Sequence, residues 1–352
     1  MVDEILSACT CGPQDGAQLA DDAPSSAEVH ASAAAHPAVH ATSNSSHDVS
    51  LEVNFGGIRM KNPVNTAAGT FAFGQQFEKF FDVSKLGAIT TKGASITPWP
   101  GNPAPRMCEV TSGIINSVGL QNPGVQGLID AAGEYLRGLR SKNCQVICQV
   151  AGHSPEEFEQ ALMKFEAEAD FASAFEINIS CPNIACDGKA TGSSASATEA
   201  LIKRLRALTT RPLLVKLGPV NIPDIARACE AAGADGLSLI NSIPGMAIDT
   251  TTYKSKISRP TGGFSGPAIH PIAVRMVWEA HKAVQLPLCG IGGITSGLDA
   301  AEFILAGATC VAVGLSNLYD PTSAPRILDE LSTWARQQGV NDINELIGAC
   351  SC

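Results

Sequence analysis

Two glycine-containing stretches, GIGGI (residues 290–294) and VAVGLSN (residues 311–317), decide the fold class of this chain. Each closes a short apolar run that precedes a segment with helical periodicity. At the ends of two such strands, α/β barrels often bind phosphate through backbone N–H groups and the start of a helix. The chain has no GxGxxG pattern opening a βαβ unit, which argues against a Rossmann dinucleotide site.

Six similar apolar runs precede these two, and helical patterns lie between them. The eight strand-like runs are Pro63–Gly69, Leu86–Gly93, Gln145–Gly152, Ala174–Ser180, Pro212–Gly218, Gly236–Ser242, Pro287–Gly293 and Cys310–Asn317. The helical patterns are Val125–Arg140, Ser154–Ala169, Ala195–Leu208, Ile222–Ala232, Pro271–Val284, Leu298–Ala306 and Ala324–Gln338. Eight strands that alternate with helices predict a single closed (β/α)8 TIM barrel, with an open doubly wound sheet as the alternative.

The first 50 residues differ from the rest of the 352-residue chain. They hold seven acidic residues and no Lys or Arg, so only −3 of the net charge of −10 belongs to residues 51–352. They are rich in Ala and Ser and contain no aromatic residue, which predicts a disordered tail. We therefore expect a tail at 1–50, a barrel at 51–345 and a flexible C-terminus at 346–352. The near-neutral barrel offers no basic surface for nucleic acid or anionic membranes.

Several signals point to a cytoplasmic enzyme without a structural metal. The chain begins MVDEIL, with no basic region of a secretory signal, and no apolar run approaches the roughly 18 residues of a membrane span. Its 12 cysteines lack the paired CxxC spacing of zinc sites and are interpreted as reduced thiols. Four of the seven histidines lie in the tail at irregular spacing, so we expect no metal site.

Polar residues and glycines recur at the ends of the eight apolar runs, where barrels carry their chemistry. These strand-end residues are Ala67 to Thr70, Lys92, Gly93, Gln149, Asn178 to Asn183, Lys216, Asn241, Ser242, Gly292, Gly293 and Gly314. The amides of Asn116, Asn178, Asn183 and Asn241 match a planar imide or amide ring. Lys216, in the apolar run LLVKLG, would face a group that gains negative charge, such as a reduced flavin, and Lys92 ends its strand similarly.

The stretch NISCPN (residues 178–183) holds the titratable group of this set, Cys181. A thiol can act as a nucleophile or as a general base. Because no histidine lies in a strand-end motif, a Cys–His nucleophile pair is poorly supported, and the base role is favoured.

With these motifs in view, residues from about Leu51 to Leu331 resemble the catalytic subunit of class 1 dihydroorotate dehydrogenases. The resembling stretches are KNPVNTAAGTFAFG, LGAITTKGASITPWPGNPAPR, GIINSVGLQNPG, EINISCPN, LLVKLGP, LINSIPGMAID, GGFSGPAIHPIA and GIGGI. The region GNPAPR to NSVGLQNPG looks like the NAD-linked class 1B. The membrane-bound class carries a serine base and an amphipathic N-terminal segment, and this chain has Cys181 and a tail that is not amphipathic.

The resemblance implies oxidation of (S)-dihydroorotate to orotate in pyrimidine (UMP) biosynthesis, with FMN as cofactor. Cys181 would remove the C5 proton, and FMN would accept hydride from C6. The implied substrate-binding residues are Lys92, Asn116, Ser117, Val118, Gly119, Leu120, Asn178, Asn183, Asn241 and Ser242. The implied FMN contacts are Ala68, Gly69, Lys92, Gly93, Gln149, Asn178, Lys216, Ile240, Gly266, Gly292, Gly293, Gly314 and Leu315. Residues from Pro182 to about Ser194 would form a lid over the substrate.

The resemblance also implies partners, and it leaves alternatives open. A homodimer would form a heterotetramer with a subunit that carries FAD and a [2Fe–2S] cluster and passes electrons to NAD. Fumarate, the acceptor of the homodimeric class 1A, is the alternative acceptor. A dihydropyrimidine dehydrogenase-type FMN enzyme and an inactive scaffold paralogue are the alternative functions. Asn183 favours orotate, because the pyrimidine-reducing family usually has His there.

Four features depart from the family pattern. Ala68 stands where Ser is usual, Gln149 where Asn is usual, and Leu315 where Thr is usual. The lid lacks the usual Gly-Gly pair and carries a second thiol, Cys186. Loss of one hydrogen bond of ~1.4 kcal/mol predicts about tenfold weaker FMN binding.

Overall fold

Eight parallel strands form the centre of the computed structural model, which describes residues 48–180, 185–186 and 189–351. They are β3 (Val64–Thr66), β4 (Ala88–Thr90), β7 (Gln145–Val150), β8 (Ala174–Asn178), β11 (Leu213–Lys216), β12 (Gly236–Leu239), β17 (Leu288–Gly290) and β18 (Cys310–Val313). Each pairs in parallel with the next along the chain from β4 to β18, and β18 pairs with β3. The predicted (β/α)8 barrel is confirmed.

The barrel closes between β3 and β4 through side chains as well as backbone. The carbonyl of Val64 accepts a hydrogen bond from the N–H of Gly87 at 3.0 Å. The carboxamide oxygen of Asn62 accepts from the same N–H at 2.9 Å and from that of Val64 at 3.2 Å. Inside the barrel, the amide of Asn65 donates to the hydroxyl of Thr90 at 2.9 Å. Two buried asparagines therefore complete the seam where the regular strand ladder stops.

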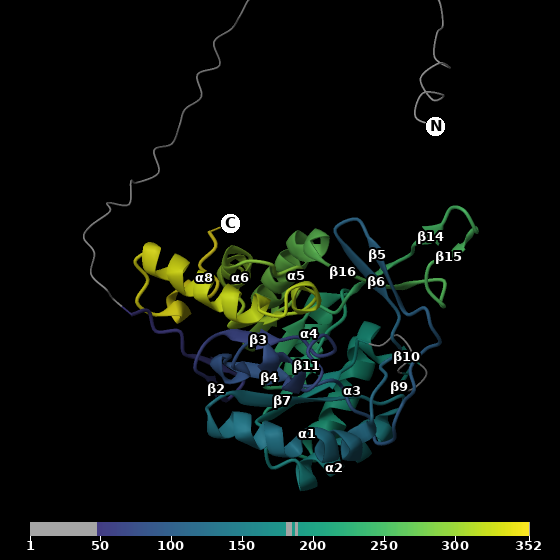
Figure 1. Ribbon diagram of the computed structural model, residues 1–352. Helices are drawn as coiled ribbons and strands as arrows, with labels where there is room; N and C mark the ends of the chain where they lie inside the picture. Colours follow the sequence, from purple (N-terminus) through teal and green to yellow (C-terminus); the bar gives the residue numbers. More distant parts are fainter. Residues whose placement is uncertain (1–47, 181–184, 187–188, 352) are drawn as a thin grey trace, which may run out of the picture. The chain divides into compact units, whose positions relative to one another are not determined.

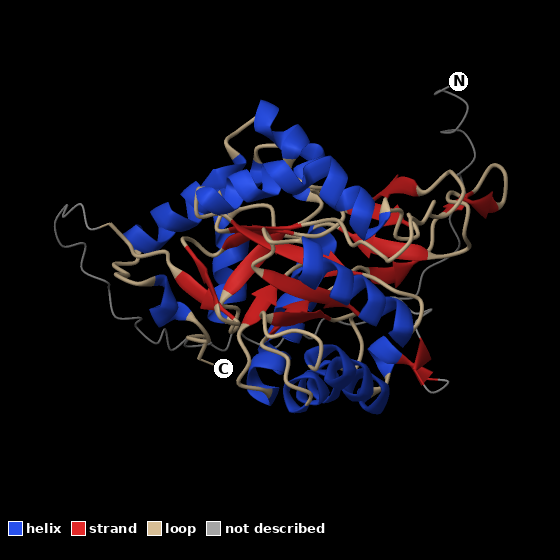
Figure 2. Ribbon diagram, turned by 90° about the horizontal axis from the view of Figure 1, so that it is seen from below, coloured by secondary structure: helices blue, strands red, loops and turns tan. Residues whose placement is uncertain are grey.

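Helices surround the strands on both sides in Figure 2. They are α1 (Gly124–Ser141), α2 (Pro155–Glu168), α3 (Ala195–Arg206), α4 (Ile222–Ala231), α5 (His270–Ala283), α6 (Gly297–Leu305), α7 (Ser316–Tyr319) and α8 (Ser323–Gln337). The predicted start of α2 is confirmed, because the Ser154 hydroxyl accepts from the N–H of Glu157 and Pro155 opens the helix. The core lies between the two layers, where Phe165 of α2 packs against Phe175 of β8.

Most predicted strands run too long at their C-terminal ends. The run predicted as Cys310–Asn317 is a strand only to Val313, and α7 begins at Ser316. At the Gly-rich ends, the chain turns out of the sheet into a loop at the barrel mouth before the apolar run stops. Apolar content alone therefore does not show where the strand ends.

Short antiparallel strands that the sequence did not predict lie outside the barrel (Figure 1). The first two strands of the described chain are β1 (Val53–Phe55) and β2 (Ile58–Met60). A four-stranded sheet contains β5 (Met107–Val110), β6 (Gly113–Asn116), β13 (Ile243–Gly245) and β16 (Gly262–Ser265). Two further hairpins are β9 (Ala185–Cys186) with β10 (Lys189–Ala190), and β14 (Ile248–Asp249) with β15 (Lys254–Ser255). Because β13 directly follows β12, the four-stranded sheet stands at the C-terminal end of the barrel strands.

Five 3-10 helices complete the described elements. They are η1 (Gln75–Lys79), η2 (Val83–Lys85), η3 (Thr191–Ser193), η4 (Pro267–Ile269) and η5 (Ile343–Leu346). None of the helices in the described ranges is long and apolar enough to cross a membrane.

The predicted tail lies almost entirely outside the described residues. The described part begins at Asp48, and Ser50 pairs with the segment before η5, since its N–H donates to the carbonyl of Asn341 at 2.8 Å. In the segment expected to be flexible, 346–352, the N–H groups of Gly348 and Cys350 donate to the last turn of α6 at 3.0 and 3.1 Å.

Candidate active site

A row of polar and thiol side chains lines one level of the barrel interior. Strand register makes neighbours of Asn178, Lys216, Ser238, Cys289 and Cys310, which come from five successive strands. Phe175 of β8 faces the helices, so the alternate residues Glu176 and Asn178 face inward. All seven residues named here are buried. Burial of so many polar groups in one layer is typical of a site rather than of a structural core.

Two lysines bring cations to this end of the barrel, Lys216 buried and Lys92 half-buried. Lys216 is 5 % exposed, and within the described ranges it forms no hydrogen bond and no ion pair. The ammonium of Lys92 lies over the backbone of Gly69, where a Cβ atom would stand 3.6 Å from it. Burial lowers the pKa of Lys92 below its ordinary value. Unpaired buried cations are costly in a protein, so both are suited to an anionic ligand.

Side-chain amides at the mouth are joined in a continuous hydrogen-bonded chain. Gln149 donates to Glu176 at 2.7 Å, and Asn178 donates to the Gln149 carbonyl oxygen at 3.4 Å. The Ser180 hydroxyl donates to the Asn178 carbonyl oxygen at 2.6 Å and accepts from the Asn241 amide. We call this series of hydrogen bonds, from Glu176 through Gln149, Asn178 and Ser180 to Asn241, the amide relay. It joins β7 and β8 to the segment that follows β12. It holds two of the predicted ring-binding amides in fixed orientations.

The end of β6 and the loop after it carry the predicted substrate residues from Asn116 to Leu120. The Asn116 amide donates to the carbonyl of Gly263 in β16 at 3.2 Å, which ties β6 to the four-stranded sheet. Gly119 and Leu120 both have positive φ, of 74° and 51°. The conformation is held by Asn102, whose amide donates to the carbonyl and hydroxyl of Ser117. A rigid loop with strained backbone beside the mouth is suited to position a small ligand.

Arg106 supports the same loop, and it is not among the predicted site residues. Its guanidinium donates to the carbonyls of Asn102 and Pro100 and to the side chain of Gln121. No acidic residue in the described part of the chain pairs with it. The guanidinium therefore acts as a brace between two loops, and Arg is favoured there because it offers several donors in one plane.

The loops after β17 and β18 contain two kinds of glycine. One is required by the packing of the protein, and at the other a Cβ atom would fit. A Cβ atom at Gly293 would collide with the Gly266 carbonyl oxygen at 2.7 Å, so this glycine is required by the protein itself. At Gly314 a Cβ atom would make only ordinary contact, 3.6 Å from Ala67, and φ is not positive. Neither packing nor backbone conformation explains a glycine there, and a ligand that lies against the backbone would explain it.

The remaining predicted cofactor residues lie at the same end of the barrel. Ala68 and Gly69 follow β3, Lys92 and Gly93 follow β4, Ile240, Asn241 and Ser242 follow β12, Gly266 follows β16, Gly292 and Gly293 follow β17, and Gly314 and Leu315 follow β18. Cys181, Pro182 and Asn183 lie outside the described residues, as does part of the predicted lid. The structure thus brings together the predicted residues that it describes.

Glu176 of the amide relay was missed from the sequence, and Ser180 was named there only within the strand-end run from Asn178 to Asn183. Glu176 and Ser180 share the period-two alternation with Asn178, so the signal was a polar residue at every second position of an apolar strand. Only the neighbouring strands reveal what they contact.

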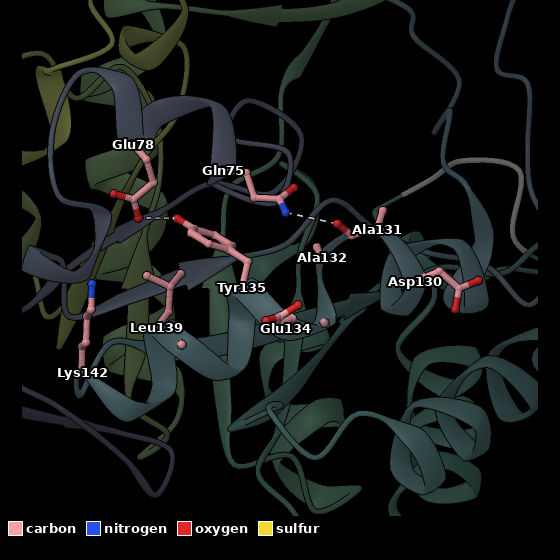
Figure 3. A pocket seen from close by; sticks show the side chains of 11 residues that line it. Gln75, Glu78, Asp130, Ala131, Ala132, Glu134, Tyr135, Leu139 and Lys142 are labelled. Atoms are coloured by element: carbon pink, nitrogen blue, oxygen red, sulfur yellow. Dashed lines mark hydrogen bonds between the residues drawn. The ribbon is translucent and has the colours of Figure 1, made fainter.

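A hollow of about 440 Å³ on the outer surface is not part of this site (Figure 3). It lies between η1 and α1, where the Tyr135 hydroxyl donates to Glu78 at 2.8 Å and Gln75 donates to the Ala131 carbonyl. Burial, with the hydrogen bond to Glu78, raises the pKa of Tyr135. None of the predicted site residues lines it. No group of three or more metal-ligating side chains occurs in the described ranges either.

Comparison with known proteins points to one family. Residues 50–334 match the family model described as dihydroorotate dehydrogenase. The chain is 45% identical over 304 residues to the dihydroorotate dehydrogenase B (NAD(+)) catalytic subunit of Geotalea uraniireducens, covering 86% of this chain and 98% of that protein. The protein of the same description from Trichlorobacter lovleyi is 42% identical over 301 residues, which cover 85% and 98% of the two chains.

A solved structure supports the fold. The crystal structure of a DHODH from Eimeria tenella in complex with ferulenol superposes with a TM-score of 0.71 at 24% sequence identity. The match covers 86% of this chain and 89% of that one.

Proposed function

The chain belongs to the dihydroorotate dehydrogenase family, and from this premise we propose that it is a class 1B catalytic subunit that oxidises dihydroorotate to orotate. The observation that carries the proposal is the convergence at the barrel mouth of two lysines without acidic partners among the described residues, one buried and one half-buried, and an ordered set of amides. An anionic, planar imide matches both features. The reaction belongs to pyrimidine biosynthesis.

We assign the substrate to the groups around Lys92. Its ammonium would pair with the orotate carboxylate, which replaces the solvation lost on burial. Asn178 and Asn241, with Asn116, Asn183 and Ser242, would bind the ring, and Ser117 to Leu120 would pack against it. Cys181, which follows the relay residue Ser180, would remove the C5 proton as general base. The lid from Pro182 to about Ser194 would exclude water.

We assign FMN to the deeper part of the mouth. Lys216, Gln149 and Asn178 would face its ring system, and Gly314 and Leu315 would lie against its phosphate. The other contacts would come from Ala68, Gly69, Lys92, Gly93, Ile240, Gly266, Gly292 and Gly293. When bound, FMN supplies the acceptor for the hydride that leaves C6. The fit is supported by the unpaired ammonium of Lys216 and by the unexplained glycine at position 314.

Of the three departures at the FMN positions, the contact with Glu176 explains Gln149, and nothing in the structure explains Ala68 or Leu315. Gln149 is one methylene longer than Asn, and this length lets it reach Glu176 at 2.7 Å. The hydroxyl of Ser316 donates to the carbonyl of Ile294, so it is engaged within the protein and does not replace the missing Thr at position 315. We therefore keep the expectation of about tenfold weaker FMN binding for the loss of one hydrogen bond.

We propose that a second subunit completes the enzyme. The two relatives are described as catalytic subunits of NAD(+)-linked enzymes, which suggests a separate partner. The partner would carry FAD and a [2Fe–2S] cluster and reduce NAD, in a heterotetramer built on a dimer of this chain. Omitting the partner from a reconstituted mixture should abolish NAD reduction. Turnover with fumarate in the absence of the partner would instead indicate the class 1A acceptor.

The deciding experiment mixes the purified full-length chain anaerobically with L-dihydroorotate and follows the visible flavin absorbance. Rapid bleaching in the parent chain and very slow bleaching in Cys181→Ala would support cofactor, substrate and base together. A yellow protein that does not bleach with dihydroorotate, but does with a dihydropyrimidine, would favour the related pyrimidine enzyme. A colourless chain that cannot be loaded with FMN would favour the scaffold.

We also propose that residues 1–50 have no catalytic role. A chain that starts near Ser50 should keep full turnover, and a large loss would contradict this.

A further inference from the structure

Glu176 is a buried carboxylate that has no place in the proposed chemistry. Its side chain faces the barrel interior from β8, is 3 % exposed, and forms no ion pair within the described ranges. Its one hydrogen bond among the described residues comes from the amide nitrogen of Gln149 at 2.7 Å. A buried carboxylate without a cation is costly. Its presence therefore calls for an explanation in terms of what it contacts.

A carboxylate can only accept hydrogen bonds. It therefore fixes which group donates and which accepts at each following step of the relay. A carboxamide is nearly symmetric in shape and can turn by 180°, which exchanges its donor and acceptor ends. Against an ionised Glu176, however, Gln149 has to present its nitrogen, as it does at 2.7 Å. Its oxygen then faces Asn178, whose nitrogen donates to it at 3.4 Å. The Asn178 oxygen is left to accept from the N–H and hydroxyl of Ser180, at 3.3 and 2.6 Å.

The far end of the relay agrees with this direction. The Ser180 hydroxyl gives its proton to Asn178, so its lone pairs accept from the Asn241 amide. The Asn241 oxygen then accepts from the backbone N–H of Ser242 at 2.8 Å, and an N–H can only donate. If Gln149 turned, its nitrogen would oppose the nitrogen of Asn178, and Asn178 would lose its hydrogen bond with one of its two partners, Gln149 or Ser180.

We propose that Glu176 is a positioning residue, which acts through Gln149 to fix the amide orientation of Asn178 and, through Ser180, of Asn241. Its consequence for ligand binding rests on the proposed function, because Asn178 and Asn241 are there assigned to the orotate ring. The orientation itself is a property of the protein and can be measured without any ligand.

The test compares Glu176→Gln with the parent, both as the full-length chain loaded with FMN. The substitution keeps the size of the side chain, but the new carboxamide can present either end to Gln149. We expect the orotate Kd, measured from the perturbation of the flavin absorbance, to rise about tenfold, equivalent to 1.4 kcal/mol. Glu166→Gln is the matched control, because it makes the same substitution at a half-buried carboxylate on helix α2 that accepts from the Thr209 hydroxyl at 2.8 Å and has no place in the relay. Its orotate Kd should stay within about twofold of the parent.

A purely structural role predicts a different pattern. It would lower the melting temperature and the FMN content of Glu176→Gln, but the fraction that holds FMN would bind orotate with the parent Kd. That result would overturn the proposal. If Glu176→Gln does not fold, Ser180→Ala breaks the relay at a half-buried position and should also raise the orotate Kd. Unchanged binding in Ser180→Ala would equally contradict a relay. Where both variants fold, their effects should be less than multiplicative in the double variant.

A ligand-free measurement separates this inference from the proposed function. In the parent chain, the side-chain amide protons of Gln149 should exchange with solvent much more slowly than those of the exposed Gln75, and Glu176→Gln should remove the protection. Fast exchange in the parent would overturn the relay. Slow exchange in a chain that binds no orotate would leave the relay standing and refute the proposed substrate.

Discussion

Lys216 and Asn178 are register partners on neighbouring strands, yet the amide of Asn178 makes no bond to the lysine. The Asn178 oxygen accepts from Ser180, and one of its two amide N–H groups donates to Gln149. The ammonium of Lys216 is thus left, within the described part of the chain, without an acceptor in the barrel wall. This combination is what makes the site suited to bring in a ligand with negative charge.

Lys216→Met should change stability and cofactor binding in opposite directions. Removal of a buried unpaired charge should raise the melting temperature of the FMN-free chain, because the desolvation cost disappears. FMN affinity should fall at least about tenfold, because the lost contact is to a charged group. Thermal unfolding and flavin fluorescence titration measure the two effects. Lys164→Met is the matched control, since Lys164 pairs with Glu168 on the surface of α2, and it should change neither quantity.

Orotate binding should weaken in alkaline solution through Lys92. Burial lowers the pKa of this ammonium below 10.5, so its charge is lost at a lower pH than in an exposed lysine. Once the pH exceeds the lowered pKa, the orotate Kd should rise towards tenfold per pH unit. The titration is best done in Cys181→Ala, which removes the thiol. In the additional variant Lys92→Arg the guanidinium stays charged, and the rise should vanish.

The lowered pKa of Lys92 should also affect folding: the free energy of unfolding should rise with pH, although orotate binding weakens. Between the lowered pKa and 10.5 the unfolded chain binds more protons than the folded chain, so the contribution of Lys92 to the free energy of unfolding rises with pH. Denaturant titrations of parent and Lys92→Arg across this window should differ in slope. A parent that loses stability relative to Lys92→Arg as pH rises would contradict the assignment.

Ser238→Ala should stabilise the FMN-free chain by about 1 kcal/mol, because a buried hydroxyl without a partner among the described residues is removed. Ser84→Ala is the contrasting variant. The Ser84 hydroxyl is also buried but donates to Asp82 at 2.6 Å, so its loss should destabilise by about 1 kcal/mol. Equal effects of the two variants in urea unfolding would show that hydrogen bonding does not distinguish them.

Asn62→Ala should weaken the closure of the barrel. The buried N–H groups of Val64 and Gly87 would lose the carboxamide oxygen, and the carbonyl of Lys85 would lose its donor. We expect a loss of about 2–4 kcal/mol in the free energy of unfolding, because buried groups are left with fewer partners. Asn344→Ala, at an exposed position of η5, should cost much less. A cost below about 1 kcal/mol for Asn62→Ala would mean that backbone contacts alone close the seam.

The barrel and most of its elements could be predicted from the sequence because each strand and helix carries its own periodicity. Within the described ranges, the seven helices of two or more turns lie within about two residues of their predicted ends. The antiparallel strands β5, β6, β13 and β16 were missed, since they are short and partly exposed, and β6 pairs with β16 over 100 residues away. Such pairing depends on contacts that no local pattern records.

For the site, the residue types at the strand ends were readable from the sequence, because a parallel barrel brings all its strand ends to one mouth. The sequence by itself therefore determined the family, the barrel and the set of polar strand ends. Only the tertiary structure decided which of these groups are satisfied and which are not. It paired Gln149 with Glu176, joined Asn178 to Asn241 through Ser180, and left Lys216 without an acidic partner among the described residues. The reason is physical: a hydrogen bond depends on the distance and direction between atoms on different strands, and these are set only when the barrel closes.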